Sequence, residues 1–265
     1  MLPTFIGLGA QRAGTTWAYN CLAEHPDVFM TKKKELHFFY VNYGRGLSWY
    51  EGQFADAGDA KARGEITPDY MYHEVALANI ARDVPGVKAF VILRNPLDRA
   101  ASAFALHPDR YQGLSFREAV ERFPELLDRG RYAQHLAVVM RYFPDDRLKV
   151  MFYDDLAAAP GAFLDDLFAF VGVPTGFRPE SLQTRYNRVI YPGFQKWLLG
   201  NGMGWAIDWA KHSPVGGWIR ARHSTSRMDE SGLSRKDLQE LTGRVAADVE
   251  ALSAMTGRDL RHWLA

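Results

Sequence analysis

Short, mostly apolar runs alternate along the chain with longer segments that show helix signals. The apolar runs are typical of buried strands and occur at residues 5–8, 28–30, 62–66, 88–93 and 147–153. Caps, helix-starting prolines and helical core spacing predict helices over 15–22, 73–83, 96 onward, 115–127, 131–143, 160–171 and 234–255. Because strands that alternate with helices form parallel sheets, we expect an α/β fold, namely a P-loop-like doubly wound parallel sheet flanked by helices.

The segment 5–17, FIGLGAQRAGTTW, predicts a strand, a small-residue loop and the start of a helix. Unpaired backbone N–H groups in such a loop and at a helix N-terminus bind anions. Gly9, Gly14 and Thr16 fit the nucleotide P-loop spacing G-x-x-x-x-G-K-[ST], but Thr15 occupies the lysine position and the positive charge lies inside the loop at Arg12. The segment is therefore either a phosphate-binding loop with a displaced charge or an ordinary strand-to-helix turn.

A second strand-to-helix turn follows the apolar run 88–93. The run ends in Arg94, and Asn95 and Pro96 are residues favoured at the cap and first position of a helix. P-loop NTPases use an aspartate that holds Mg²⁺ at the end of such a strand, whereas a cation here favours a second anion. Ser102 follows roughly two helical turns later. Because parallel sheets bind ligands at the carboxyl ends of their strands, we expect Arg12 and Arg94 on the same rim.

Composition limits the function more than it specifies it. The 265 residues suit a single domain over 1–265, and a net charge of +1 gives no electrostatic reason to expect nucleic acid or a membrane surface as a partner. The single cysteine, Cys21, excludes an internal disulfide framework. The sequence shows no signal segment and no apolar span of 18 residues, so we expect a cytoplasmic protein without stable membrane insertion. Nothing in the sequence predicts an oligomeric state.

Four motifs, in order, are similar to those of the sulfotransferases that use 3′-phosphoadenosine-5′-phosphosulfate (PAPS), closest to the bacterial and heparan-sulfate-sulfotransferase-like branch. QRAGTTW resembles the family's loop for the 5′-phosphosulfate, and RNPLDRAASAF resembles its 3′-phosphate motif. Residues 34–39, KELHFF, resemble K-E-x-H-F-F of the glycan branch, and residues 64–70, GEITPDY, resemble its G-E-K-T-P-x-Y. The resemblance implies PAPS as cofactor, no metal, and a cofactor site made of Gln11, Arg12, Ala13, Gly14, Thr15, Thr16, Trp17, Arg94 and Ser102.

The resemblance also implies catalytic roles. An acceptor hydroxyl or amine loses a proton as it attacks sulfur, and Glu35 is implied as the general base, with His37 as its helper and Arg12 stabilising the developing charge. Without the family, Glu35 is one surface charge among 31 acidic residues, and His37 beside two phenylalanines is equally a packed histidine. Ile66 stands where the glycan branch has lysine, so one cationic contact is missing there. Thr67 and Tyr70 remain polar candidates.

Residues 185–232 are rich in glycine, tryptophan and basic residues, and we expect a helical C-terminal cap or lid over the site. The resemblance implies that a late basic residue, Arg220, Arg222 or Arg227, closes over PAPS; solvated arginines are the alternative. The acceptor is a small molecule, glycan, lipid or peptide. Two rival functions stay open. One is a P-loop kinase or NTPase-like phosphotransferase, disfavoured by Thr15 and Arg94, and the other is a nucleotide-binding module without catalysis.

Overall fold

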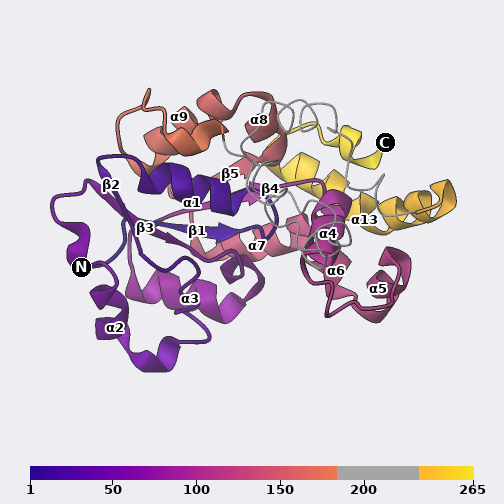
Figure 1. Ribbon diagram of the computed structural model, residues 1–265, viewed down its shortest axis with the longest axis horizontal. Coiled ribbons are helices and arrows are strands. Elements are labelled where there is room, and N and C mark those ends of the chain that lie inside the picture. The colour runs from indigo at the N-terminus through magenta and orange to yellow at the C-terminus, as the bar shows by residue number, and fades with distance from the viewer. Residues whose placement is uncertain (184–232) are drawn as a thin grey trace, which may run out of the picture.

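Five parallel strands form one sheet in the order β2-β3-β1-β4-β5 (Figure 1). The structure is a computed structural model that describes residues 1–183 and 233–265. The strands are β1 Phe5–Gly9, β2 Val28–Met30, β3 Ala62–Ile66, β4 Lys88–Leu93 and β5 Leu148–Phe152. The predicted strands and the parallel α/β fold are confirmed. The predicted lid over 185–232, with Arg220, Arg222 and Arg227, lies outside the described residues.

Strand β1 lies at the centre of the sheet, between β3 and β4. Its register pairs Phe5 with Gly64 on β3 and with Lys88 on β4. All five β1 residues are buried, as expected for a parallel strand covered on both faces. A side chain at Gly64 would meet the Phe5 ring at 2.2 Å, so this glycine allows close packing. The chain switches from one side of β1 to the other between β3 and β4, which places the ligand crevice at the carboxyl ends of these strands.

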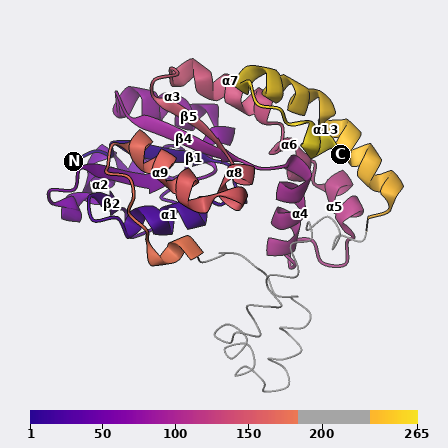
Figure 2. The ribbon, with the colours of Figure 1, turned by 90° about the horizontal axis from the view of Figure 1, so that it is seen from above.

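Helices cover both faces of the sheet (Figure 2). One face carries α1 Thr15–Ala23, α8 Tyr153–Ala158 and α9 Pro160–Val171; the other carries α3 Glu74–Asp83 and α7 Tyr132–Tyr142, with α13 Arg235–Thr256 against α7. Beyond one end of the sheet lie α4 Pro96–Leu106, α5 Phe116–Arg122 and α6 Glu125–Asp128. The short α2, Leu47–Gly52, buries Tyr50 against Phe38 with ring centroids 4.5 Å apart. Within the described ranges, no helix is both long and apolar enough to cross a bilayer.

Two predicted element boundaries are wrong. The helix predicted over 115–127 is two helices, α5 and α6, although its capping box between Ser115 and Glu118 is confirmed. Pro124 disfavours helical backbone at the residue before it, and Phe123 has φ −130° and ψ 75°. The strand predicted to reach residue 153 ends at Phe152, and Tyr153 begins the unpredicted helix α8.

Candidate active site

The loop after β1 has the features of an anion cradle. Gly14 caps α1 in the left-handed conformation with φ +94°, and a side chain there would meet Leu156 Cδ2 at 2.9 Å. Within the described residues, α1 has no acidic residue in its first turn and its cap makes no side-chain hydrogen bond. Its first backbone N–H groups are therefore directed toward the rim of the sheet without a fixed negative partner.

The two arginine-bearing turns lie side by side. Arg12 Nε donates to Ser102 Oγ at 3.0 Å, and Arg94 Nη1 donates to the backbone carbonyl of Arg12 at 3.4 Å. The Arg94 guanidinium also lies 4.8 Å from the Tyr153 ring centroid and 3.7 Å from Asp98 Oδ2. Arg94 Nε is buried and has no hydrogen-bond partner within the described residues. The structure thus brings Arg12, Arg94 and Ser102 together, as expected from adjacent strand ends.

Helix α4 is built to present this second turn. The Asn95 side chain accepts hydrogen bonds from the backbone N–H groups of Leu97 and Asp98 at 2.9 and 3.2 Å, and Pro96 is the first helical residue. The predicted cap is therefore confirmed. Ser102 is 2% exposed and reaches the site only through its hydroxyl.

Glu35 and His37 form the second part of the site. His37 Nε2 lies 3.6 Å from Glu35 Oε2, and Lys34 Nζ contacts Glu35 Oε1 closely. Arg12, Glu35 and His37 are the non-glycine residues with positive φ in the described chain, at 69°, 65° and 49°. Each left-handed non-glycine residue costs on the order of 1–3 kcal/mol, and such strain clusters at functional sites. The three residues implied to be catalytic are therefore also the strained ones.

A buried carboxyl group beneath the site accepts three hydroxyl hydrogen bonds. Glu65, at the end of β3, accepts from Thr67 Oγ1 at 2.7 Å, Tyr70 OH at 2.9 Å and Tyr50 OH at 3.1 Å. Burial raises the pKa of the Glu65 carboxyl, and hydrogen bonds from these hydroxyls and from the Leu36 backbone N–H oppose that rise. Thr67 and Tyr70 are polar candidates for the site in the sequence. In the structure they do not face an acceptor; they support the loop that carries Glu35.

The same carboxyl group anchors the backbone that follows Glu35. Glu65 binds the Leu36 N–H directly, Thr67 Oγ1 accepts from the His37 N–H at 3.4 Å, and Tyr70 OH accepts from the Phe38 N–H at 2.9 Å. These bonds secure successive N–H groups of a strained segment. The result is a fixed backbone path for the segment that carries Glu35 and His37.

Three further polar residues join the two parts of the site and do not stand out in the sequence. Arg129 Nη1 donates at 2.8 Å both to Gln11 Oε1 and to Asp69 Oδ1. Asp69 Oδ2 in turn accepts from Tyr40 OH at 3.4 Å. Arg129 follows α6 and lies 118 positions from Gln11, so only the folded chain brings them together.

Some of the residues predicted to bind the cofactor have buried side chains. The Trp17 ring packs against Phe163 and donates through Nε1 to the Leu182 carbonyl at 3.4 Å, so this ring belongs to the core. Ala13 and Thr15 are buried as well. The Ala13 N–H donates to the Ala10 carbonyl at 3.3 Å, whereas Gln11 contacts Arg129 and Arg12 carries the charge.

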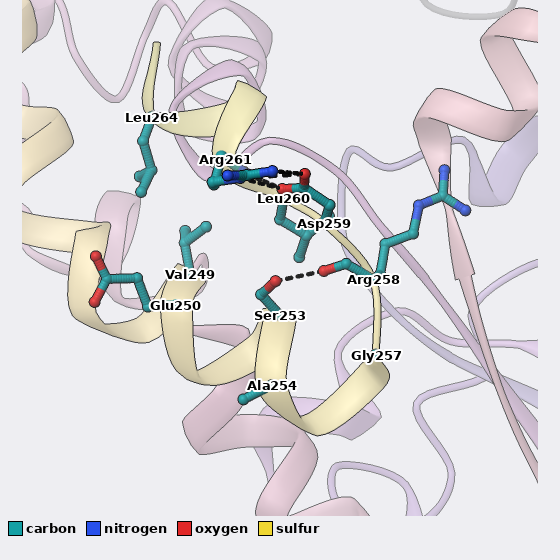
Figure 3. A pocket seen from close by; sticks show the side chains of 10 residues that line it. All are labelled: Val249, Glu250, Ser253, Ala254, Gly257, Arg258, Asp259, Leu260, Arg261 and Leu264. Carbon is teal, nitrogen blue, oxygen red and sulfur yellow. Dashed lines mark hydrogen bonds and ion pairs between the residues drawn. The ribbon is translucent and has the colours of Figure 1, made fainter.

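A cavity of about 530 Å³ lies elsewhere, beside the C-terminal turn (Figure 3). It is lined by α13 and the segment after it, and Figure 3 shows Arg261 paired with Asp259 there. Its lining includes none of the candidate residues above. Residues 1–183 and 233–265 contain no group of three or more metal-ligating side chains.

Comparisons with known proteins identify the family of the chain. A family model described as "Sulfotransferase domain" matches residues 3–195. Mouse heparan sulfate glucosamine 3-O-sulfotransferase 6 is 32% identical over 180 residues, which span 64% of this chain and 52% of that protein. Human bifunctional heparan sulfate N-deacetylase/N-sulfotransferase 3 is 29% identical over 196 residues, 65% of this chain and 22% of that protein. The chain thus spans about half the length of the first of these relatives.

A solved structure supports the fold of the described residues. A sulfotransferase from Alicyclobacillus acidocaldarius superposes with a TM-score of 0.75 at 23% identity, and the alignment covers all of both chains. At that identity the likeness concerns the fold. Since the family model covers well over half of the chain, including both arginine turns and the Glu35 segment, this protein belongs to the sulfotransferase domain family.

Proposed function

We propose that this protein is a sulfotransferase that moves a sulfuryl group from PAPS to a hydroxyl or amine acceptor. The observation that carries the proposal is the contact between two cationic turns, Arg12 with Ser102 and Arg94 with the Arg12 carbonyl. A ligand with phosphate groups on the 5′ and 3′ positions of one adenosine needs two anion sites within reach of a single nucleotide. A triphosphate bound with Mg²⁺ instead needs a lysine in the loop and an acidic residue after the second strand. In this chain Thr15 occupies the lysine position and Arg94 occupies the position of the acid.

The residues present fit such a donor. Gly14 lets the loop pack closely against Leu156, and the α1 N-terminus adds donors and a positive dipole end. Arg94 Nε is a buried donor whose partner is absent from the described residues, so an anion at this position completes its hydrogen bonding. We assign the 5′-phosphosulfate to residues 11–17 and the 3′-phosphate to Arg94 and Ser102.

The side chains then divide the work of transfer. When bound, the donor supplies an activated sulfuryl group with a good phosphate leaving group. Arg12 and the loop N–H groups stabilise the negative charge that develops during in-line attack. Glu35 accepts the proton of the attacking hydroxyl, Lys34 holds its carboxylate in place, and His37 Nε2 lies 3.6 Å from its second oxygen. Residues 36–38 are tied to the end of β3, which keeps the base fixed relative to the loop.

The acceptor that we propose is a glycan or another small hydroxyl compound. The relatives named above carry heparan sulfate in their names, which supports a glycan or another small hydroxyl compound as acceptor. Ile66 is buried where the glycan branch has a lysine, and the lysine that pairs with Glu35 here is Lys34.

A transfer assay tests this function. Purified protein is incubated with sulfur-labelled PAPS and pooled glycan, phenol, lipid and peptide acceptors, and labelled products are separated. We expect metal-independent labelling of at least one pool and release of 3′-phosphoadenosine 5′-phosphate (PAP). Tight PAP binding without any labelled product favours the non-catalytic module, and transfer that requires ATP and Mg²⁺ favours the phosphotransferase.

A further inference from the structure

A continuous series of polar contacts links the donor loop to the base. At one end, Arg129 Nη1 joins Gln11 Oε1 to Asp69 Oδ1, both at 2.8 Å. Asp69 is largely buried, and its second oxygen faces Tyr40 OH at 3.4 Å. The Arg129 guanidinium also lies over the Tyr72 ring, 4.9 Å from its centroid, which fixes its plane.

At the other end, both nitrogens of the His37 ring are engaged. Nδ1 lies 2.7 Å from Tyr40 OH, and Nε2 lies 3.6 Å from Glu35 Oε2. The Tyr40 ring is held by His73, stacked at 4.3 Å between centroids, and meets the edge of His37 at 5.7 Å. Tyr40 therefore has a fixed hydroxyl position between a carboxylate and an imidazole.

The protons available to Tyr40, Asp69 and His37 decide which group donates and which accepts in each hydrogen bond of this series. The Tyr40 hydroxyl has one proton, and the Asp69 carboxylate can only accept it. With that proton directed to Asp69, the Tyr40 oxygen accepts from His37, so the neutral ring carries its proton on Nδ1. His37 Nε2 then presents a lone pair toward Glu35 Oε2, which can donate to it only once Glu35 has taken a proton from the acceptor.

The surrounding charges are consistent with this arrangement. Burial, with Asp69 nearby, raises the pKa of Tyr40 to about 12, so the hydroxyl keeps its proton. Burial lowers the pKa of the neighbouring His73. The other charged groups that face the series are Glu35, Lys34 and Arg129.

We propose that Tyr40 and Asp69 are positioning residues for sulfuryl transfer, because they orient the His37 ring so that its Nε2 takes the proton that Glu35 removes from the acceptor. This inference rests on the proposed function. The acceptor O–H bond breaks as a bond to Glu35 Oε2 forms; that bond then breaks as His37 Nε2–H forms, which returns Glu35 to its carboxylate. The imidazolium so formed donates to Tyr40 and Glu35 and later releases its proton to water. Arg129 fixes Asp69 relative to Gln11 and thus aligns base and donor loop.

Replacing Tyr40 with phenylalanine tests the proposal with little change of shape. Tyr43→Phe is the matched control, since Tyr43 OH binds Asp83 at 2.5 Å and is no part of the series. We expect Tyr40→Phe to lower kcat about tenfold or more, with KM for PAPS and PAP affinity nearly unchanged, because proton transfer by a positioned group is worth about 10²–10⁴-fold. Tyr43→Phe keeps the wild-type kcat. Equal kcat in wild type and Tyr40→Phe, or equal losses in both variants, overturns the proposal.

A readout without turnover separates this inference from the proposed function. Long-range ¹H–¹⁵N spectra of the histidine rings report which His37 nitrogen carries the proton. We expect the Nδ1–H form in wild type and Tyr43→Phe, and a mixture of forms in Tyr40→Phe and in Asp69→Asn. Identical His37 spectra in all four proteins would refute the inference that Tyr40 and Asp69 orient the His37 ring. If the wild type shows the expected spectra but transfers no sulfuryl group, the proposed function is refuted, while the orientation of His37 by Tyr40 is still supported.

Discussion

Replacing Glu65 with glutamine tests how the fold holds the base. The side chain keeps its shape but exchanges one acceptor oxygen for an amide NH₂ group. The Thr67 and Tyr70 hydroxyls each already accept a hydrogen bond from a backbone N–H group. Their own protons are directed at Glu65, which is the acceptor that the substitution alters. About two buried donors then lose their acceptor, at roughly 1–3 kcal/mol each, while removal of a buried carboxylate offsets part of the loss. We expect the free energy of unfolding to fall by about 2–4 kcal/mol at neutral pH.

Denaturant unfolding monitored by tryptophan fluorescence measures this change, with Glu74→Gln as the control. Glu74 also accepts a tyrosine hydroxyl, from Tyr142 at 2.9 Å, but on the exposed surface, so its replacement should leave stability nearly unchanged. In Glu65→Gln we also expect kcat to fall roughly tenfold or more with PAP affinity retained, because the segment that aims Glu35 loosens. Equal unfolding free energies and equal kcat for Glu65→Gln and wild type would refute the reasoning.

The pH dependence of this difference has a definite sign. Burial raises the pKa of Glu65 in the folded state, so the folded state binds its proton more tightly than the unfolded state does. Stability from this group is therefore fully present below the usual glutamate range and is lost as pH rises through the raised pKa. Glutamine has no such proton. The stability difference between wild type and Glu65→Gln should shrink as pH rises, and a difference that grows would contradict the assignment.

Three further predictions concern the site directly. Arg12→Ala should lower kcat by about 10²-fold or more, as for the loss of an oxyanion-type donor, and a steady-state loss below about tenfold would remove that role. Glu35→Gln should abolish labelled transfer while calorimetry still shows PAP binding; a wild-type rate would exclude Glu35 as the base. Gly14→Ala should weaken PAP binding in the same titration. The new methyl group would lie 2.9 Å from Leu156 Cδ2 on a left-handed backbone, so the loop would have to shift. Unchanged affinity would place the donor elsewhere.

The strand-to-helix turns could be predicted because local signals reinforce one another there. Each apolar run ends at a charged or small residue, and parallel strands bring such ends to one rim; Arg12, Arg94 and Ser102 meet for that reason. Pro124 also marks the break between α5 and α6 in the sequence, whereas the capping box at Ser115 marks only where the first helix begins.

The supporting network could not be predicted from local pattern. Glu65 lies within a motif, but its role depends on Tyr50, a residue from a separate helix. Arg129 comes from a turn between helices and reaches Gln11 only after α4 to α6 have folded beyond the sheet. Such contacts join residues far apart in the chain, and neither hydrophobic spacing nor turn chemistry encodes them.

Nucleotide binding by wild type and Arg94→Ala tests the central claim most directly, namely that two neighbouring cationic turns bind both ends of one adenosine bisphosphate. Isothermal titration calorimetry measures the affinity of each protein for PAP and for 5′-AMP. We predict that Arg94→Ala weakens PAP binding about 10- to 100-fold, the worth of hydrogen bonds to a charged group, and changes 5′-AMP affinity by less than about threefold. An equal loss of affinity for both nucleotides would contradict the account, because Arg94 would then not contact the 3′-phosphate.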